Sequence, residues 1–190
     1  MRDDATEPRE APTLADLLDL AWARLEAGAA SAGAAARNLA VATVAPEGPR
    51  VRTLVLRGAD RAAGTLELHA DLASAKVREL RQDPRAMLHV WDEGASLQIQ
   101  IRARAEILSG EAVAAIWDRV PEEARSNYGG APEPGEALPS PDAYAPGAEP
   151  ARFAVLRFHA EAVETLLLGE ATRRAAFHRD DGFQGRWLAP

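Results

Sequence analysis

Residues 52–76 read Arg-Thr-Leu-Val-Leu-Arg-Gly-Ala-Asp-Arg-Ala-Ala-Gly-Thr-Leu-Glu-Leu-His-Ala-Asp-Leu-Ala-Ser-Ala-Lys. This segment predicts a strand that ends at Arg57 and Gly58, a polar turn, a second strand to about Ala70, and then an amphipathic helix. Side chains alternate between the two faces of a strand. One face of the first strand therefore carries Arg52, Leu54 and Leu56, and the other carries Thr53, Val55 and Arg57.

The start of the predicted helix is a candidate anion site. Ser74 offers a hydroxyl beside the unpaired N–H groups of the first helical turn, and Lys76 adds a positive charge. Folding of the hairpin can bring Arg52 to the same phosphate, which its guanidinium would bind through two hydrogen bonds. The alternative is that all three are ordinary surface residues. From the residues alone, that alternative is the simpler interpretation.

The flanking segments predict a mainly β protein with a few helices. Thr13 and Asp16 form a predicted capping box for a first helix, which ends among the glycines of residues 28–33. Residues 96–108 alternate strictly between apolar and polar side chains, as in a strand with one face in the core. Further strands are predicted at 38–44, 86–91, 151–168, 173–178 and 186–189, with a turn at 180–182, and helices at 110–120 and 121–128. The short connections favour a closed or split barrel of about six antiparallel strands with flanking helices.

Two segments fall outside this pattern. Residues 1–12 are charged and contain proline, so we expect a disordered arm. Residues 129–150 hold six of the thirteen prolines, and no stable helix or strand is predicted there. A loop of this length is expected to be a lid, a dimer arm or an insertion. Residues 13–190 are expected to form a single domain.

Composition argues against several classes of function. A net charge of −7 disfavours a nucleic-acid or anionic-membrane surface, and the lack of cysteine removes disulfides, thiolate catalysis and cysteine-ligated metals. The histidines at 69, 89, 159 and 178 show no ligand spacing, so no metal site is expected. No signal peptide or membrane-spanning run is predicted, which makes the cytoplasm the expected compartment.

Several short motifs together carry a family resemblance. They are Arg-Thr-Leu-Val-Leu-Arg-Gly at 52–58, Glu-Leu-His-Ala-Asp-Leu-Ala-Ser-Ala-Lys at 67–76, Arg-Gln-Asp-Pro-Arg-Ala at 81–86, and Arg-Trp-Leu-Ala-Pro at 186–190. Their order and spacing resemble the pyridoxamine 5'-phosphate oxidase-like family of FMN-binding split barrels over roughly residues 36–190. The resemblance implies a homodimer with FMN at the subunit interface.

The resemblance also implies the cofactor-binding residues. Arg52, Ser74 and Lys76 would hold the FMN phosphate, and the backbone of Thr53, Leu54, Val55 and Leu56 would bind the pyrimidine side of the ring. Arg57 would lie near N1 of the flavin, or else be an exposed strand end. Gln98 would hydrogen-bond the ring. His69 and Ala70 stand where the family has an aromatic–hydroxyl pair, and Ala75 stands where it has a basic residue.

The substrate half of the family pattern fits less well. Residues 166–176 lack the family's Trp and have Ala at its second Arg position, and residues 117–126 do not match its Tyr, Arg and Ser phosphate clamp. The function implied is an FMN-dependent oxidoreductase with a small-molecule substrate, whose catalytic residues are unknown. The alternatives are a non-catalytic FMN-binding protein and a split barrel that has lost its cofactor.

Overall fold

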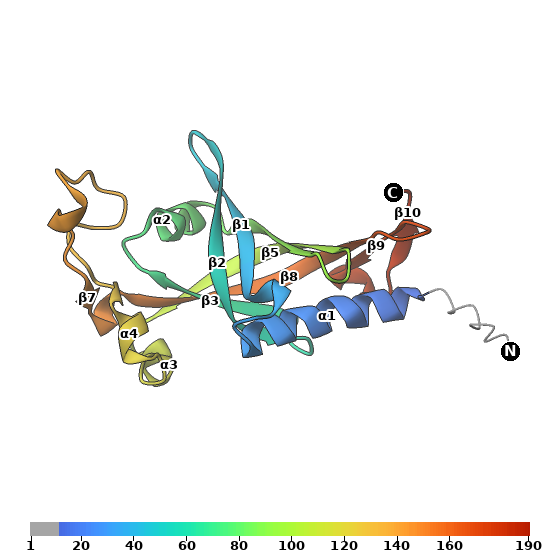
Figure 1. Cartoon of the computed structure of the whole chain (residues 1–190), viewed down its shortest axis with the longest axis horizontal. Coiled ribbons are helices and arrows are strands. Elements are labelled where there is room, and N and C mark those ends of the chain that lie inside the picture. Colours follow the sequence, from blue (N-terminus) through green and yellow to red (C-terminus); the bar gives the residue numbers. More distant parts are fainter. Residues whose placement is uncertain (1–11) are drawn as a thin grey trace, which may run out of the picture.

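The computed structural model describes residues 12–190, and its body is a closed β-barrel. Six antiparallel strands close it in the order β8-β3-β2-β1-β4-β5, because β5 pairs back with β8. Their bounds are β1 (Asn38–Ala45), β2 (Gly48–Asp60), β3 (Thr65–Asp71), β4 (Arg85–Asp92), β5 (Leu97–Ser109) and β8 (Phe153–Leu167). The predicted antiparallel barrel is therefore confirmed (Figure 1). All of the predicted disordered arm except Pro12 lies outside the described residues.

Two short strands extend the sheet beyond β8. β9 (Arg173–His178) pairs with β8, and β10 (Arg186–Leu188) pairs with β9. Both strands agree with the prediction. The predicted turn at 180–182 lies within a longer connection, which begins with a 3-10 turn at Arg179–Asp181 and continues through Gly182 at φ 68°.

Alternate residues of the strands fill the barrel. On β5, the side chains of Leu97, Ile99, Ile101 and Ala103 point inward and are fully buried. On the opposite face of the strand, Gln98 is half-buried and Arg102 is exposed. This confirms the predicted alternation. Burial of each such leucine or isoleucine contributes roughly 1.5–3 kcal/mol relative to exposure. The core is therefore apolar, and most of the polar side chains lie on the outer face of the barrel or at its ends.

Two helices pack on the barrel. α1 (Leu14–Ala30) starts with the predicted capping box of Thr13 and Asp16 and ends within residues 28–33, as predicted. Gly28 is required there, because a Cβ would lie 2.6 Å from the backbone of Ala36. α2 (Ala75–Gln82) packs against β1 and buries Val77 and Leu80, in keeping with the predicted amphipathic helix.

Residues 110–128 form shorter helices than the sequence predicts. The predicted helix over 110–120 is confirmed in part: a 3-10 turn at Gly110–Val113 leads into α3 (Ala114–Trp117), where the helix ends. α4 (Glu122–Arg125) supplies the expected further turn. Val113, Trp117 and Val120 pack with Tyr128 and Phe153 in a second, smaller core. Val113, Trp117 and Val120 lie at helical spacing and share the side that packs in this core.

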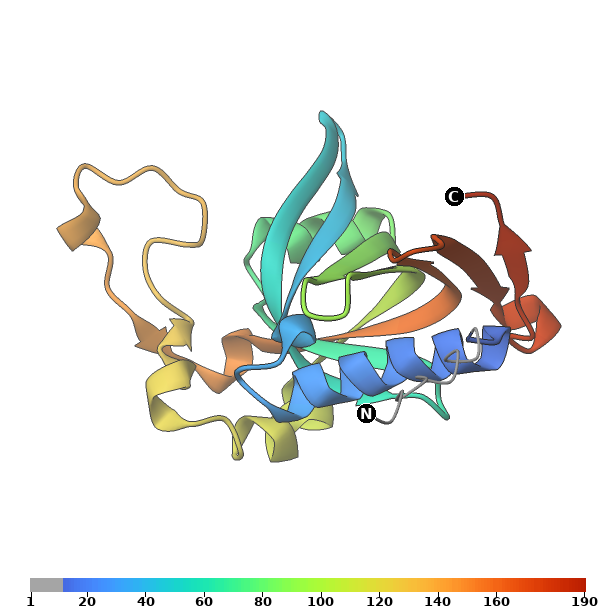
Figure 2. The same ribbon diagram turned by 45° about the vertical axis from the view of Figure 1, so that its right-hand side comes forward.

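Residues 129–146 form a loop that stands away from the barrel (Figure 2). The expectation that 129–150 contains no strand is wrong at one end, because β7 (Gly147–Ala148) pairs in parallel with β6 (Asn127–Tyr128). The two strands approach so closely that a Cβ on Gly147 would lie 2.1 Å from the carbonyl oxygen of Gly129. Short 3-10 turns also occur at Pro141–Ala143 and Pro150–Arg152.

Asp71 anchors the base of this loop to β3. Its carboxylate accepts a hydrogen bond from the Gly129 N–H at 2.7 Å and forms an ion pair with Arg152 at 2.8 Å. Asp71 is 5% exposed, so both interactions are shielded from water. Among residues 12–190, no helix is both long enough and apolar enough to span a bilayer.

Candidate functional site

The barrel is split between β2 and β3. Residues 56–60 of β2 pair with residues 65–68 of β3, whereas residues 52–55 pair with β1 alone and residues 69–71 pair with β8 alone. In the described part of the chain, the main-chain groups that face each other across this gap have no strand partner. Unpaired N–H and C=O groups are strong hydrogen-bonding sites. Main-chain groups of successive residues point to alternate edges of a strand, so alternate residues within 53–55 present groups to the gap that a ligand can bind.

Arg52 lies near one end of the barrel and is held by an acidic partner. Its guanidinium forms an ion pair with Glu79 of α2 at 2.7 Å and donates to the hydroxyl of Thr43. Glu79 is 5% exposed and also binds Arg50 at 3.0 Å. Burial alone would raise the pKa of Glu79, but hydrogen bonds from Thr43 and Arg52 and the arginine charges together lower it. Arg52 is thus positioned and partly neutralised by Glu79.

Ser74 is the N-cap residue of α2, but its side chain makes no capping hydrogen bond. The Oγ atom is buried and has no hydrogen-bond partner among the described residues. Such a hydroxyl costs free energy unless a ligand satisfies it. Because the first N–H groups of a helix also lack intrahelical acceptors, this end of α2 can receive an anion with several oxygens.

Lys76 lies in the first turn of α2, and it is the only lysine in the sequence. Its side chain is half-buried and forms no ion pair within residues 12–190. Burial, and then the charge of Arg52, lower the pKa of Lys76, while Asp71 and Glu79 partly oppose this. The structure therefore brings Arg52 and Lys76 to the same end of the barrel, beside the buried hydroxyl of Ser74.

Leu56 and Ala70 point away from any surface site. Both side chains belong to the barrel core, with exposed fractions of 0% and 3%. Only their main-chain groups can contact a ligand. Thr53 is exposed, and Val55 is half-buried on the outer face.

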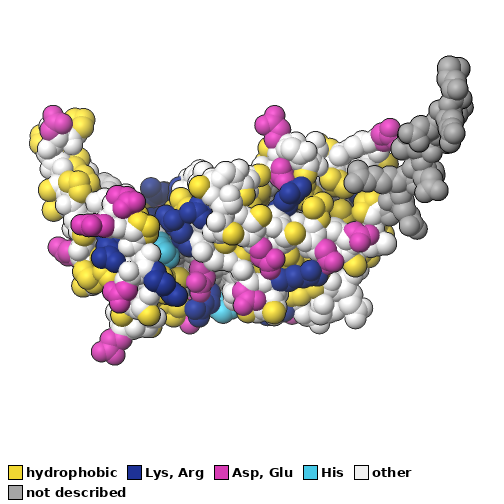
Figure 3. Space-filling view, turned by 60° about the horizontal axis from the view of Figure 1, so that its bottom comes forward, with side chains coloured by type: hydrophobic (Ala, Val, Ile, Leu, Met, Phe, Trp, Pro, Cys, Tyr) yellow, Lys and Arg dark blue, Asp and Glu magenta, His cyan; other side chains and the backbone are white. Residues whose placement is uncertain are grey.

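A β-bulge places Arg57 on β2. Leu56 pairs with Leu68, and Gly58 pairs with Glu67, so Arg57 is the additional residue. Bulges redirect the side chain that they carry. Arg57 lines a cavity of about 290 Å³, together with Glu67, His69, Ile116, Arg119, Val120 and Pro121. On the face shown in Figure 3, Lys and Arg side chains gather beside a histidine.

His69 forms part of that cavity wall. Its ring meets Phe153 edge-on with centroids 4.8 Å apart, and its Nδ1 atom is buried without a partner in the described structure. Burial, followed by the charge of Arg57, lowers the pKa of His69 to about 4. The imidazole is therefore neutral at neutral pH. The sequence pattern did not indicate Glu67 or Arg119, because each looks like an ordinary exposed residue of a strand or helix.

Gln98 lies apart from the residues around Arg52. It is on the outer face of β5, opposite Trp91 of β4 and Leu166 of β8. Within the described residues, no hydrogen bond joins the Gln98 side chain to the other candidate residues. The chain on its own does not bring Gln98 to the gap between β2 and β3.

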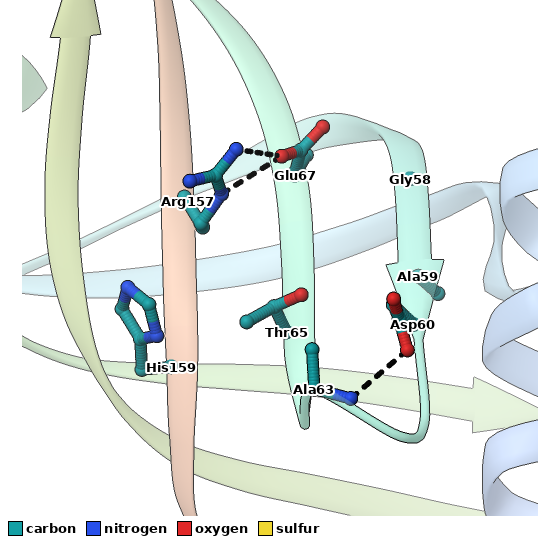
Figure 4. Close-up of a pocket in the computed structure, with 8 residues that line it drawn as sticks. All are labelled: Gly58, Ala59, Asp60, Ala63, Thr65, Glu67, Arg157 and His159. Carbon is teal, nitrogen blue, oxygen red and sulfur yellow. Dashed lines mark hydrogen bonds and ion pairs between the residues drawn. The ribbon is translucent and has the colours of Figure 1, made fainter.

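A larger cavity, of about 530 Å³, lies beside the β2–β3 turn (Figure 4). Its charged side chains already have partners: Arg157 binds Glu67 at 2.8 Å, and His159 lies 3.0 Å from Glu106. Asp60 accepts a hydrogen bond from the Ala63 N–H. This cavity therefore offers fewer uncommitted charges than the one beside His69. No cluster of three or more His, Cys, Asp or Glu residues suited to a metal ion occurs within residues 12–190.

Comparison with known proteins relates this geometry to a family. The pyridoxamine 5'-phosphate oxidase family model matches residues 28–167. A pyridoxamine 5'-phosphate oxidase-related, FMN-binding protein from Nostoc punctiforme has a TM-score of 0.74 and 26% identity, and the match covers 96% of this chain and 100% of that one. No match was found among curated proteins.

Two more distant structures share the fold. PhzG from Burkholderia lata, solved with tetrahydrophenazine-1-carboxylic acid, has a TM-score of 0.65 and 20% identity, over 81% of this chain and 82% of that one. A protein related to general stress protein 26, from Clostridium acetobutylicum, has a TM-score of 0.59 and 15% identity, over 90% and 99%. The family model spans well over half of the sequence, and the split barrel agrees with it. The chain belongs to the pyridoxamine 5'-phosphate oxidase family.

Proposed function

We propose that the chain binds FMN and acts as an FMN-dependent oxidoreductase on a small molecule. The observation that carries the proposal is the buried hydroxyl of Ser74 beside the ammonium of Lys76, at the open end of the β2–β3 split; neither group has a partner among residues 12–190. A phosphate monoester has several oxygens and a negative charge, which match these donors. The FMN-binding relative from Nostoc punctiforme supports this choice of cofactor.

The residues of the chain divide the binding between phosphate and ring. The Ser74 hydroxyl and the first N–H groups of α2 would donate to the phosphate, and Lys76 and Arg52 would add charge. The unpaired main-chain groups of residues 53–55 would bind the edge of the ring. Arg57 would place positive charge near it. When bound, FMN supplies hydride transfer.

We also propose that the protein is a homodimer. Four large apolar side chains are exposed on the outer face of β1, β2 and β4: Val44 at 44%, Val51 at 66%, Met87 at 38% and Trp91 at 45%. Ala42 pairs with both Val51 and Met87, so these strands present one continuous face. An apolar face on neighbouring strands favours burial against another protein surface. Light scattering should report a dimer, and Val51→Glu with Trp91→Glu should give a monomer that keeps its β-sheet circular dichroism. A monomeric wild-type protein would overturn the proposal that the protein is a homodimer.

FMN binding is tested by purifying the protein without added cofactor and titrating it with FMN and with riboflavin, which lacks the phosphate. We expect saturation near one FMN per chain. Lys76→Met should weaken FMN binding by about 10- to 100-fold and leave riboflavin binding unchanged, because one charge-assisted hydrogen bond contributes roughly 1.5–3 kcal/mol. Arg81→Met is the matched control, since Arg81 is exposed in the last turn of α2.

The outcomes separate the candidate functions. A protein that ignores FMN would overturn the proposal and favour a barrel that has lost its cofactor, which the pairing of Arg52 with Glu79 also supports. If FMN binds, the activity is tested with oxygen and the 5'-phosphates of pyridoxine and pyridoxamine, and with other small donors. Bound flavin that no donor reduces would overturn the oxidoreductase and favour a non-catalytic FMN-binding protein.

A further inference from the structure

Two arginines line the cavity beside His69, and neither has an anionic partner among the described residues. Arg57 comes from the bulge of β2, and Arg119 comes from the segment between α3 and α4. Neither side chain forms an ion pair or a side-chain hydrogen bond within residues 12–190. The one carboxylate in the lining, Glu67, is bound by Arg157 at 2.8 Å. The charge available to a ligand here is therefore positive.

The rest of the lining is apolar or neutral. Ile116, Val120 and Pro121 supply hydrocarbon surface, and His69 presents a neutral ring whose buried Nδ1 has no partner among the described residues. A cavity of about 290 Å³ lies just below the usual range for ligand pockets. A molecule that fits must combine a small apolar body with an anionic group.

The donors that line the cavity suit a carboxylate better than a phosphate. A phosphate monoester carries up to two charges on three terminal oxygens, and such groups are usually bound by hydroxyls and backbone N–H groups as well as cations. The residues that line this cavity include no Ser, Thr or Tyr; Tyr128 belongs to the second core and is not part of the lining. Pro121, which does line the cavity, has no backbone N–H to donate. Guanidinium forks bind carboxylates and phosphates alike, so the preference for a carboxylate rests on the missing hydroxyl donors and on Glu67. The nearby carboxylate of Glu67 also opposes a dianion more strongly than a monoanion.

We propose that this cavity binds a small monocarboxylate with an apolar body, whose carboxylate is held by Arg57 and Arg119. The inference that such a carboxylate is the substrate rests on the proposed function. The inference that the cavity binds a carboxylate does not. Arg119 would then determine specificity, in the segment where the family's phosphate clamp could not be matched in the sequence.

The test is calorimetric titration of the full chain, loaded with FMN and also without it, using three probes that share one ring. Benzoate carries a carboxylate, phenyl phosphate carries a phosphate, and benzyl alcohol carries no charge. We expect benzoate to bind at least about 10-fold more tightly than either of the others. Arg119→Met should weaken benzoate binding by about 10- to 100-fold, as loss of a charge-assisted bidentate contact does. Arg81→Met, which also removes one exposed arginine, should leave it unchanged.

Each result bears on one proposal or the other. Benzoate binding that Arg119→Met does not weaken, or phenyl phosphate binding as tight as that of benzoate, overturns the carboxylate site while FMN binding stands. Benzoate binding to a chain that ignores FMN, lost in Arg119→Met, supports the site and overturns the proposed cofactor. FMN loading of Arg119→Met to the wild-type level shows that the variant is folded. Absence of benzoate binding to a folded, FMN-loaded wild-type protein also overturns the carboxylate site.

Discussion

Replacing Ser74 with Ala should stabilise the ligand-free protein, although a serine at a helix N-cap usually stabilises its helix. The usual loss on Ser→Ala at an N-cap is about 0.5–2 kcal/mol, because a capping hydrogen bond disappears. Ser74 makes no such bond, and its Oγ atom is buried without a partner in the described residues. A buried, unsatisfied hydroxyl costs roughly 1–3 kcal/mol. After allowing for the small void left by one oxygen, we expect a gain of about 1 kcal/mol in the free energy of unfolding.

The same substitution should have the opposite effect on ligand binding. If the Ser74 hydroxyl donates to the FMN phosphate, Ser74→Ala removes a hydrogen bond to a charged group, worth roughly 1.5–3 kcal/mol. FMN affinity should then fall by about 10- to 100-fold. Riboflavin affinity should not change. Urea unfolding of the wild-type and variant proteins, each with and without saturating FMN, measures both effects in one thermodynamic cycle.

A loss of about 1 kcal/mol or more in the Ser74→Ala protein without FMN would refute this reasoning. It would mean that the hydroxyl already caps α2 in the free protein. Thr13→Ala is the matched control, because Thr13 caps α1 through a complete capping box. That substitution should destabilise the protein by about 1 kcal/mol.

Three further predictions concern other parts of the site and the loop. Lys76→Met should raise the urea midpoint of the FMN-free protein, because burial and the charge of Arg52 disfavour the ammonium in the folded state; an unchanged or lower midpoint would contradict this. The pKa of His69 is about 4 in the folded protein and 6.5 in the unfolded chain, so the unfolded chain binds the proton more readily. The free energy of unfolding should therefore fall by up to about 3 kcal/mol as the pH drops from 7 to 4. His69→Gln should remove that part of the slope in urea unfolding measured across this pH range, and an unaltered slope would exclude His69 as its source. Gly147→Ala should speed proteolysis within residues 130–146 while leaving the barrel intact, because the new Cβ would clash with Gly129; cleavage at the wild-type rate would argue against the clash.

Local rules predicted much of the barrel. The strict alternation of residues 97–103 predicted which side chains are buried, and Thr13 with Asp16 predicted the start of α1. Both signals depend only on residues that are close together in the sequence, so they can be identified without knowing the fold. For residues 110–120, helical spacing predicted the apolar side that packs in the second core, but not the 3-10 start or the end of the helix at Trp117.

The motifs named candidate residues for the site, but they did not predict the ion pairs and the strand gap that surround these residues. The motifs place Arg52 and Lys76, yet nothing in the pattern around Glu79 distinguishes it from an exposed helical glutamate. In the structure it is buried and paired with Arg52 and Arg50. The gap between β2 and β3 was also missed, since strand pairing depends on register and on the bulge at Arg57. Long-range pairing of this kind leaves no local signature.

The isolation of Lys76 gives the protein a built-in reporter. Lys76 is the only side chain in the sequence with a primary amine, because the other permanently charged basic residues are arginines. An amine-reactive ester can therefore label only Lys76 and the amine of the chain terminus. That target is half-buried and has a lowered pKa, which leaves more of it as the nucleophilic free amine. Peptide mass spectra would separate the label on Lys76 from the label on the chain terminus, and the rate at which the Lys76 label appears would follow the occupancy of the barrel end without any coloured or fluorescent ligand.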